Sequence, residues 1–182
     1  MPDQLSMSHP TQNHHRILAI APSSKGFGFA VLEGPETLVD WGVKTVKGDK
    51  NAESLAKVEK LIAHYRPDVL VLPDVQAKDS RRAPRIRLLC KRIITLATNR
   101  KVKVALFSRE QVLRAFFEDG EGTKHTLAEI LAQRFTEQLA LCLPPKRQAW
   151  ASEDVRMNIF DAAALALVFR LNKTKAYQAA LT

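Results

Sequence analysis

The sequence has few of the residues that build disulfide frameworks or zinc sites. Its 182 residues include two cysteines, Cys90 and Cys142. Each lies among leucines in a helical pattern, so neither a disulfide framework nor a zinc-ligand spacing follows from them. We expect both to be small buried apolar residues, which favours a cytoplasmic location.

Long apolar runs are also missing. No run approaches the roughly 18 residues that a membrane-spanning helix needs, so no membrane partner is expected. The N-terminal residues have no apolar signal core, and we expect residues 1–15 to form a disordered polar tail. Three histidines of this tail (His9, His14 and His15) could bind a metal, but a solvated tail is the simpler interpretation.

Acidic residues are outnumbered by basic ones. The chain has 28 lysines and arginines against 19 aspartates and glutamates, a formal net charge of +9. Such an excess favours a polyanionic partner, most commonly nucleic acid. The densest basic segment, from Lys78 to Arg92, has almost no acids. It could hold phosphates in a salt-sensitive, sequence-independent way, or form a solvated helix face.

A second basic segment carries an aromatic side chain. Trp150 follows Lys146 and Arg147 in a proline-led loop, and could stack on a base or pack against the last helix. The candidate nucleic-acid contacts are Lys25, Lys78, Arg81, Arg82, Arg85, Arg92, Lys124, Lys146 and Arg147.

The hydrophobic pattern predicts five strands. Three apolar segments separated by short turns are typical of an antiparallel meander, and a continuous apolar run is typical of a central parallel strand. The expected strands are 16–21, 26–33, 38–46, 69–72 and 102–107. The expected helices are one capped by Asn51 and ended by Pro67, then 84–99, 109–117, one capped by Thr123 and ended by Pro144, and 153–172. This order predicts one α/β domain over residues 16–172, followed by a tail at 173–182.

The order and spacing of four segments resemble the RuvC-like Holliday-junction resolvase family, within the RNase H-like superfamily. These segments are the hairpin 17–31, the apolar strand that runs into Lys78, Gly122-Thr123-Lys124 before a helix, and 161–167 in the last helix. The resemblance implies an RNase H-like fold with a mixed five-stranded sheet flanked by helices. It also implies DNA as partner, a role in DNA recombination and repair, and Lys124 near the scissile phosphate, and it is compatible with a homodimer.

The resemblance further implies four carboxylates that hold two Mg²⁺ ions: one in the first strand, one at the end of the fourth, and two on the last helix. Two such ions stabilise the attacking and leaving oxygens of a phosphodiester. Here Ala21 replaces the first-strand aspartate, and Pro73 replaces the fourth-strand acid. Asp74 follows Pro73, and it reaches the site only if the strand has already ended, because neighbouring strand residues point to opposite faces.

The last helix supplies one clear carboxylate, Asp161. Its partner three residues away is either Asn158 or Ala164, and neither is an acid. Asp154 could substitute from the same face, or could be a favourable charge at the helix N-terminus. The candidate catalytic residues are therefore Asp161, Asp74, Asp154 and Lys124, and the candidate Mg²⁺ ligands are Asp161 and Asp74.

Three functions remain open. The first is binding of branched or duplex DNA with weak or lost nuclease activity. The second is an active Mg²⁺-dependent crossover-junction endonuclease. The third is a structural or partner-binding protein that has kept only the fold, because fold alone does not settle function. Alanine at position 21 could be natural or an engineered knockout.

Overall fold

The three N-terminal strands form an antiparallel meander in the computed structural model, which describes residues 15–180. They are β1 (Ile17–Ser23), β2 (Gly26–Glu33) and β3 (Thr37–Thr45). In β1, residues 17–22 are all buried, because helices cover both faces of the sheet at this position. The apolar first strand thus forms the centre of the fold.

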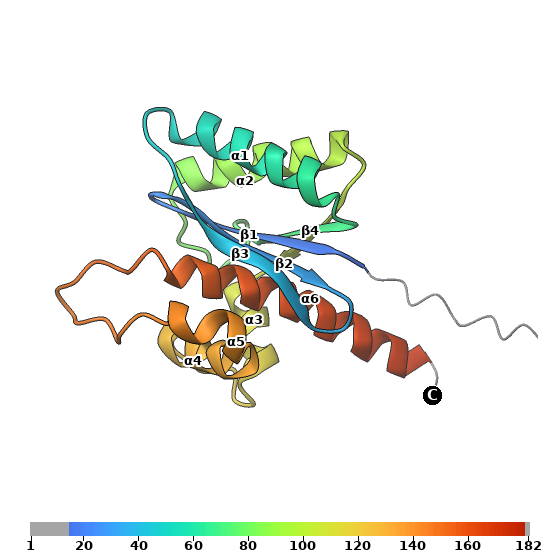
Figure 1. Cartoon of the computed structure of the whole chain (residues 1–182), viewed down its shortest axis with the longest axis vertical. Helices are drawn as coiled ribbons and strands as arrows, with labels where there is room; N and C mark the ends of the chain where they lie inside the picture. The colour runs from blue at the N-terminus through green and yellow to red at the C-terminus, as the bar shows by residue number, and fades with distance from the viewer. Residues whose placement is uncertain (1–14, 181–182) are drawn as a thin grey trace, which may run out of the picture.

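Two parallel strands complete the sheet. β4 (Val69–Pro73) pairs with β1, β5 (Lys103–Phe107) pairs with β4, and the strand order is β3-β2-β1-β4-β5. Parallel neighbours need crossover connections, and the helices α1 (Lys50–Tyr65) and α2 (Pro84–Asn99) supply them on one face of the sheet (Figure 1). The mixed five-stranded sheet predicted from the sequence is confirmed.

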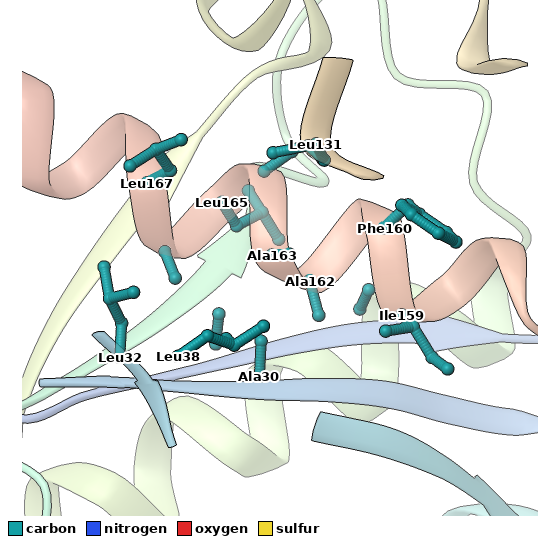
Figure 2. Packing of buried hydrophobic residues seen from close by; sticks show 14 of the residues in the cluster. Ala30, Leu32, Leu38, Leu131, Ile159, Phe160, Ala162, Ala163, Leu165 and Leu167 are labelled. Carbon is teal, nitrogen blue, oxygen red and sulfur yellow. The ribbon is translucent and has the colours of Figure 1, made fainter. Parts of the chain in front are cut away.

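The long helix α6 (Met157–Ala180) covers the other face (Figure 1). Shorter elements pack on its far side: α3 (Arg109–Phe116), α4 (Lys124–Arg134), α5 (Thr136–Leu139) and the 3-10 helix η1 (Ala140–Cys142). Figure 2 shows Ala162 of α6 above Ala30 and Leu38 of the sheet, with Leu131 of α4 on the opposite side of α6. Partners on two sides explain why residues 162–168 of α6 are all buried.

The close approach of α6 to the sheet depends on a glycine. A Cβ placed on Gly28 of β2 would lie 2.0 Å from the backbone oxygen of Asn158. No side chain fits there, so the helix backbone rests directly on the strand. Asn158 itself is buried at this contact.

The expected boundaries of three helices were wrong. Asp49, and not Asn51, caps α1 by accepting a hydrogen bond from the Ala52 amide at 3.1 Å. The helix that starts after Thr123 stops at Phe135, whose ψ of 57° leaves the helical region, and resumes as α5. The last helix begins at Met157 and continues to Ala180, so residues 173–180 are helical where a tail was expected.

Several smaller expectations concern the ends and the cysteines. Within residues 15–180, no helix has the length and apolar character to cross a membrane. Both cysteines are free: Cys90 is buried as expected, but Cys142 is only half-buried. His9 and His14 lie outside the described residues, whereas His15 is exposed, with Nδ1 3.8 Å from the carboxylate of Asp68.

Candidate nucleic-acid interface

A cavity of about 620 Å³ opens where the parallel strands end. The carboxyl ends of β1, β4 and β5 lie at the same edge of the sheet, as in open α/β sheets generally, and contribute Ala21, Pro73 and Phe107 to its wall. Helices α3, α4 and α6 close the other sides. We call this space the strand-end cavity.

Four cationic side chains line the strand-end cavity. Arg81 and Arg82 come from the loop between β4 and α2, Arg109 is the first residue of α3, and Lys124 is the first residue of α4. Arg82 also donates a hydrogen bond to the Pro22 backbone oxygen at 3.3 Å, which fixes the loop against the end of β1. The fold thus gathers positive charge from three separate segments.

Arg109 was missed by the sequence analysis. The available signal was its position directly after β5, because residues that follow parallel strands gather at one edge. Its α3 neighbour Ser108 closes a capping box with Gln111, which holds the start of this helix in place.

The carboxylate of Asp161 faces the cavity and is already paired. The Lys124 Nζ lies 3.0 Å from Asp161 Oδ2 and 3.0 Å from Glu153 Oε2. Both contacts are within hydrogen-bond distance, so the ammonium of Lys124 compensates two carboxylates. Lys124 and Asp161, both nominated from the sequence, are therefore brought together.

The structure distinguishes between the two possible pairs on the last helix. Asp161 and Ala164 line the cavity, whereas Asn158 is buried over Gly28. The position three residues after Asp161 on the cavity face is therefore an alanine, Ala164. Ala21, across the cavity, is 3% exposed. Three of the four positions that the resemblance assigns to carboxylates (Ala21, Pro73 and Ala164) are apolar.

The other two candidate acids are engaged in turns. Asp74 borders the cavity just after β4 has ended, but its Oδ1 accepts a hydrogen bond from the Gln76 amide at 2.9 Å. Asp154 precedes α6 and does not line the cavity; its carboxylate accepts hydrogen bonds from the backbone and guanidinium of Arg156. These hydrogen bonds lower the pKa of Asp154 below its usual value.

The residues present do not fit a two-metal centre. Two Mg²⁺ ions need several carboxylate oxygens around one space. In the part of the chain that is described, no three histidine, cysteine or acidic side chains are grouped in a way that could hold a metal. Asp161, the one acid at a family position, contacts an ammonium instead.

The remaining cationic candidates lie around the cavity or away from it. Arg85 is turned inward: its guanidinium donates hydrogen bonds to the Ser23 backbone oxygen at 3.1 Å and to Asn51 Oδ1 at 3.0 Å. The exposed candidates that do not line the cavity are Lys25, Lys78, Arg92, Lys146 and Arg147. Figure 1 shows the loop before α6, which holds the last two, extending away from the body of the molecule.

Trp150 lies in this extended loop. Its side chain is 83% exposed, so it does not pack against α6. The exposed ring is compatible with stacking on a base, the other role that the sequence suggests for it.

Comparisons with known proteins place the fold. No family model matches the chain, and no curated protein matches its sequence. The Thermus thermophilus RuvC structure is similar, with a TM-score of 0.64 and 16% identity over 88% of this chain and 96% of that one. The same protein in complex with Holliday junction substrate gives a TM-score of 0.62 and 15% identity, over 88% of this chain and 96% of that one.

A eukaryotic structure is similar as well. The yeast mitochondrial Holliday junction resolvase Ydc2 gives a TM-score of 0.60 and 14% identity, over 92% of this chain and 83% of that one. The chain therefore has the RuvC-like, RNase H-like fold predicted from its sequence, in nearly its full extent.

Proposed function

We propose that the chain binds branched or duplex DNA through the cationic edge around the strand-end cavity, with weak or no nuclease activity. The observation that carries this proposal is the composition of the cavity wall: Arg81, Arg82, Arg109 and Lys124 face one space, and the Asp161 carboxylate there is paired with Lys124. Cationic side chains that neutralise phosphates give affinity without reading sequence.

Two further observations support DNA as the partner. The net charge of +9 favours a polyanion, and the exposed cations Lys78 and Arg92 flank the cavity-lining arginines in the sequence. The similar RuvC structure was determined with Holliday junction substrate, and the similar Ydc2 is a Holliday junction resolvase. Four-way junctions are therefore the first DNA to test.

Loss of cleavage follows from the acids that are missing. Metal-assisted cleavage needs carboxylates to hold ions beside the scissile phosphate. Ala21, Pro73 and Ala164 have no oxygen ligand in their side chains, and Asp161 contacts Lys124 at 3.0 Å. These side chains therefore leave metal-assisted cleavage without its ligands.

The experiment that tests the function uses a labelled four-way DNA junction with Mg²⁺ or Mn²⁺. The native chain and its Ala21→Asp variant are both expected to shift the junction band without cutting it, because one added acid leaves Pro73 and Ala164 apolar. Cleavage by the native chain that disappears in Asp161→Ala would instead support an active endonuclease. Failure to bind either junction or duplex at low salt would leave the partner-binding alternative.

The homodimer and the cytoplasmic location stay predictions. Two free cysteines are compatible with a reducing compartment. Sedimentation equilibrium of the purified chain, with and without DNA, tests the dimer.

A further inference from the structure

The strand-end cavity has an apolar floor under its cationic rim. Ala21, Ala164 and Leu165 are 3%, 1% and 5% exposed, and Phe107 and Leu127 extend the same surface. A metal centre at these positions would need oxygen ligands and would be polar. The alanines instead leave an open space against hydrocarbon, which an organic group can fill.

The size of this space suits a small organic ligand. Its volume of about 620 Å³ falls within the roughly 300–1,000 Å³ of ligand sites that combine an apolar lining with a few polar groups. At the rim, Arg81 and Arg109 have no ion-pair partner among residues 15–180. Asp74 and Asp79 also border the cavity, from the same β4–α2 loop as Arg81, whereas Arg109 faces it from α3.

We propose that the strand-end cavity binds one nucleotide without a metal ion, with the base against the apolar floor and the phosphate beside Arg81 and Arg109. A base has flat apolar faces, and their contact with apolar and aromatic side chains is favourable for all four bases. A phosphate is the anion that guanidinium groups bind in a bidentate way. Lys124 stays with Asp161 and Glu153, and no step requires Mg²⁺.

Two sources could supply such a nucleotide, an unpaired nucleotide of a DNA strand or a free mononucleotide. The first rests on the proposed DNA binding, and the second does not. A base that is already unpaired enters a protein pocket at the lowest cost, because no base pair has to be broken. DNA with an unpaired nucleotide should therefore bind more tightly than fully paired DNA.

The DNA arm compares two duplexes, each with one 2-aminopurine, in buffer with EDTA. The 2-aminopurine is an unpaired bulge in one duplex and is paired with thymine in the other. The bulged duplex is expected to bind about tenfold or more tightly, because base unpairing costs a few kcal/mol, with a change in 2-aminopurine fluorescence. Leu113→Trp, which fills the cavity from α3, should remove this preference. Leu88→Trp is the matched control, because Leu88 is 45% exposed on α2 and does not line the strand-end cavity.

The free-nucleotide arm measures binding of deoxyadenosine monophosphate by calorimetry, again in EDTA. Saturable binding that Leu113→Trp abolishes and Leu88→Trp keeps identifies a free nucleotide as a ligand. If Leu113→Trp melts at a lower temperature than the native chain, Arg109→Ala is used in its place. It is expected to weaken binding about tenfold, because a charge-assisted hydrogen bond is lost.

Each outcome decides one of the two proposals. Preference for the bulged duplex, or saturable mononucleotide binding, supports the nucleotide site and names its source. Equal binding of both duplexes together with no mononucleotide binding overturns it, while DNA binding itself then stands. A chain that binds the mononucleotide but no DNA would overturn the proposed function and keep the nucleotide site.

Discussion

Arg85 shows how the role of a single cation depends on its neighbours. Arg85 and Arg92 are seven residues apart, a spacing that puts both on one helix face, and both are candidate DNA contacts in the sequence. In the structure, Arg85 joins α2 to the β1–β2 turn and to Asn51 of α1, while Arg92 is exposed. Of these two arginines, Arg85 therefore has a structural role in the free protein.

Arg85→Ala should therefore reduce stability. Removing charge-assisted hydrogen bonds to partly buried groups costs about 1.5–3 kcal/mol, and the free energy of unfolding in urea should fall by that amount. Arg92→Ala is the matched control and should change it by less than about 0.5 kcal/mol. Equal effects of the two substitutions would contradict this assignment.

The two cysteines should differ in reactivity. Burial raises the pKa of the Cys90 thiol to about 11, and only the thiolate is nucleophilic. Native protein at pH 8 should therefore be alkylated at the half-buried Cys142 while Cys90 stays unmodified, and Cys90 labelling should increase as the pH approaches 11. Mass spectrometry after timed labelling measures both sites. Rapid labelling of Cys90 at pH 8 in folded protein would be inconsistent with its burial.

At the scale of elements, the contact of α6 with β2 gives a sharp prediction. Gly28→Ala would place a Cβ 2.0 Å from the Asn158 backbone oxygen, so helix or strand must shift. Overpacking of this kind costs typically about 1–3 kcal/mol. Gly42→Ala serves as control, because its nearest neighbour is the Phe29 ring at 3.1 Å, a side chain that can move. Urea unfolding of both variants should show the larger loss for Gly28→Ala.

Elements with a strong periodic pattern could be predicted from the sequence, but their ends could be predicted only where local turn residues mark them. The boundaries of β2 and α2 were predicted correctly, because glycine and proline mark them locally. The break at Phe135 and the late start of α6 depend on tertiary packing and on the Asp154 turn, which no periodicity reveals.

The candidate site was predictable where the resemblance or the basic segment 78–92 supplied the positions, and that segment gave Arg81 and Arg82. The resemblance supplied Ala21, Asp161 and Lys124, which all line the cavity, since chain order fixes the strand and the two helices that carry them. Arg109 comes from a short helix without a functional motif, and the apolar floor forms only where α4 and α6 pack at the ends of β1 and β5. Such features depend on which segments meet in space.

At the scale of the whole molecule, DNA binding should depend steeply on salt. Each phosphate contact releases counterions, so removing one cation should reduce the slope of log affinity against log salt by about one. Arg81→Ala and Arg109→Ala should each show this reduction for junction and duplex alike, measured by fluorescence anisotropy at several salt concentrations. An unchanged slope in both variants would place the phosphate contacts elsewhere.

The central claim is that cations around the strand-end cavity bind DNA without a metal ion. It is tested most directly by the dissociation constant for a four-way junction in EDTA. Three proteins are compared: the native chain, a cavity pair (the double variant Arg81→Ala, Arg109→Ala) and a control pair (the double variant Lys60→Ala, Lys175→Ala). The last pair removes the same charge from exposed positions that do not line the cavity. The cavity pair should weaken binding about tenfold or more and the control pair only slightly, and the native chain should bind the junction without any Mg²⁺. Equal losses from both pairs, or binding that appears only with Mg²⁺, would contradict the claim.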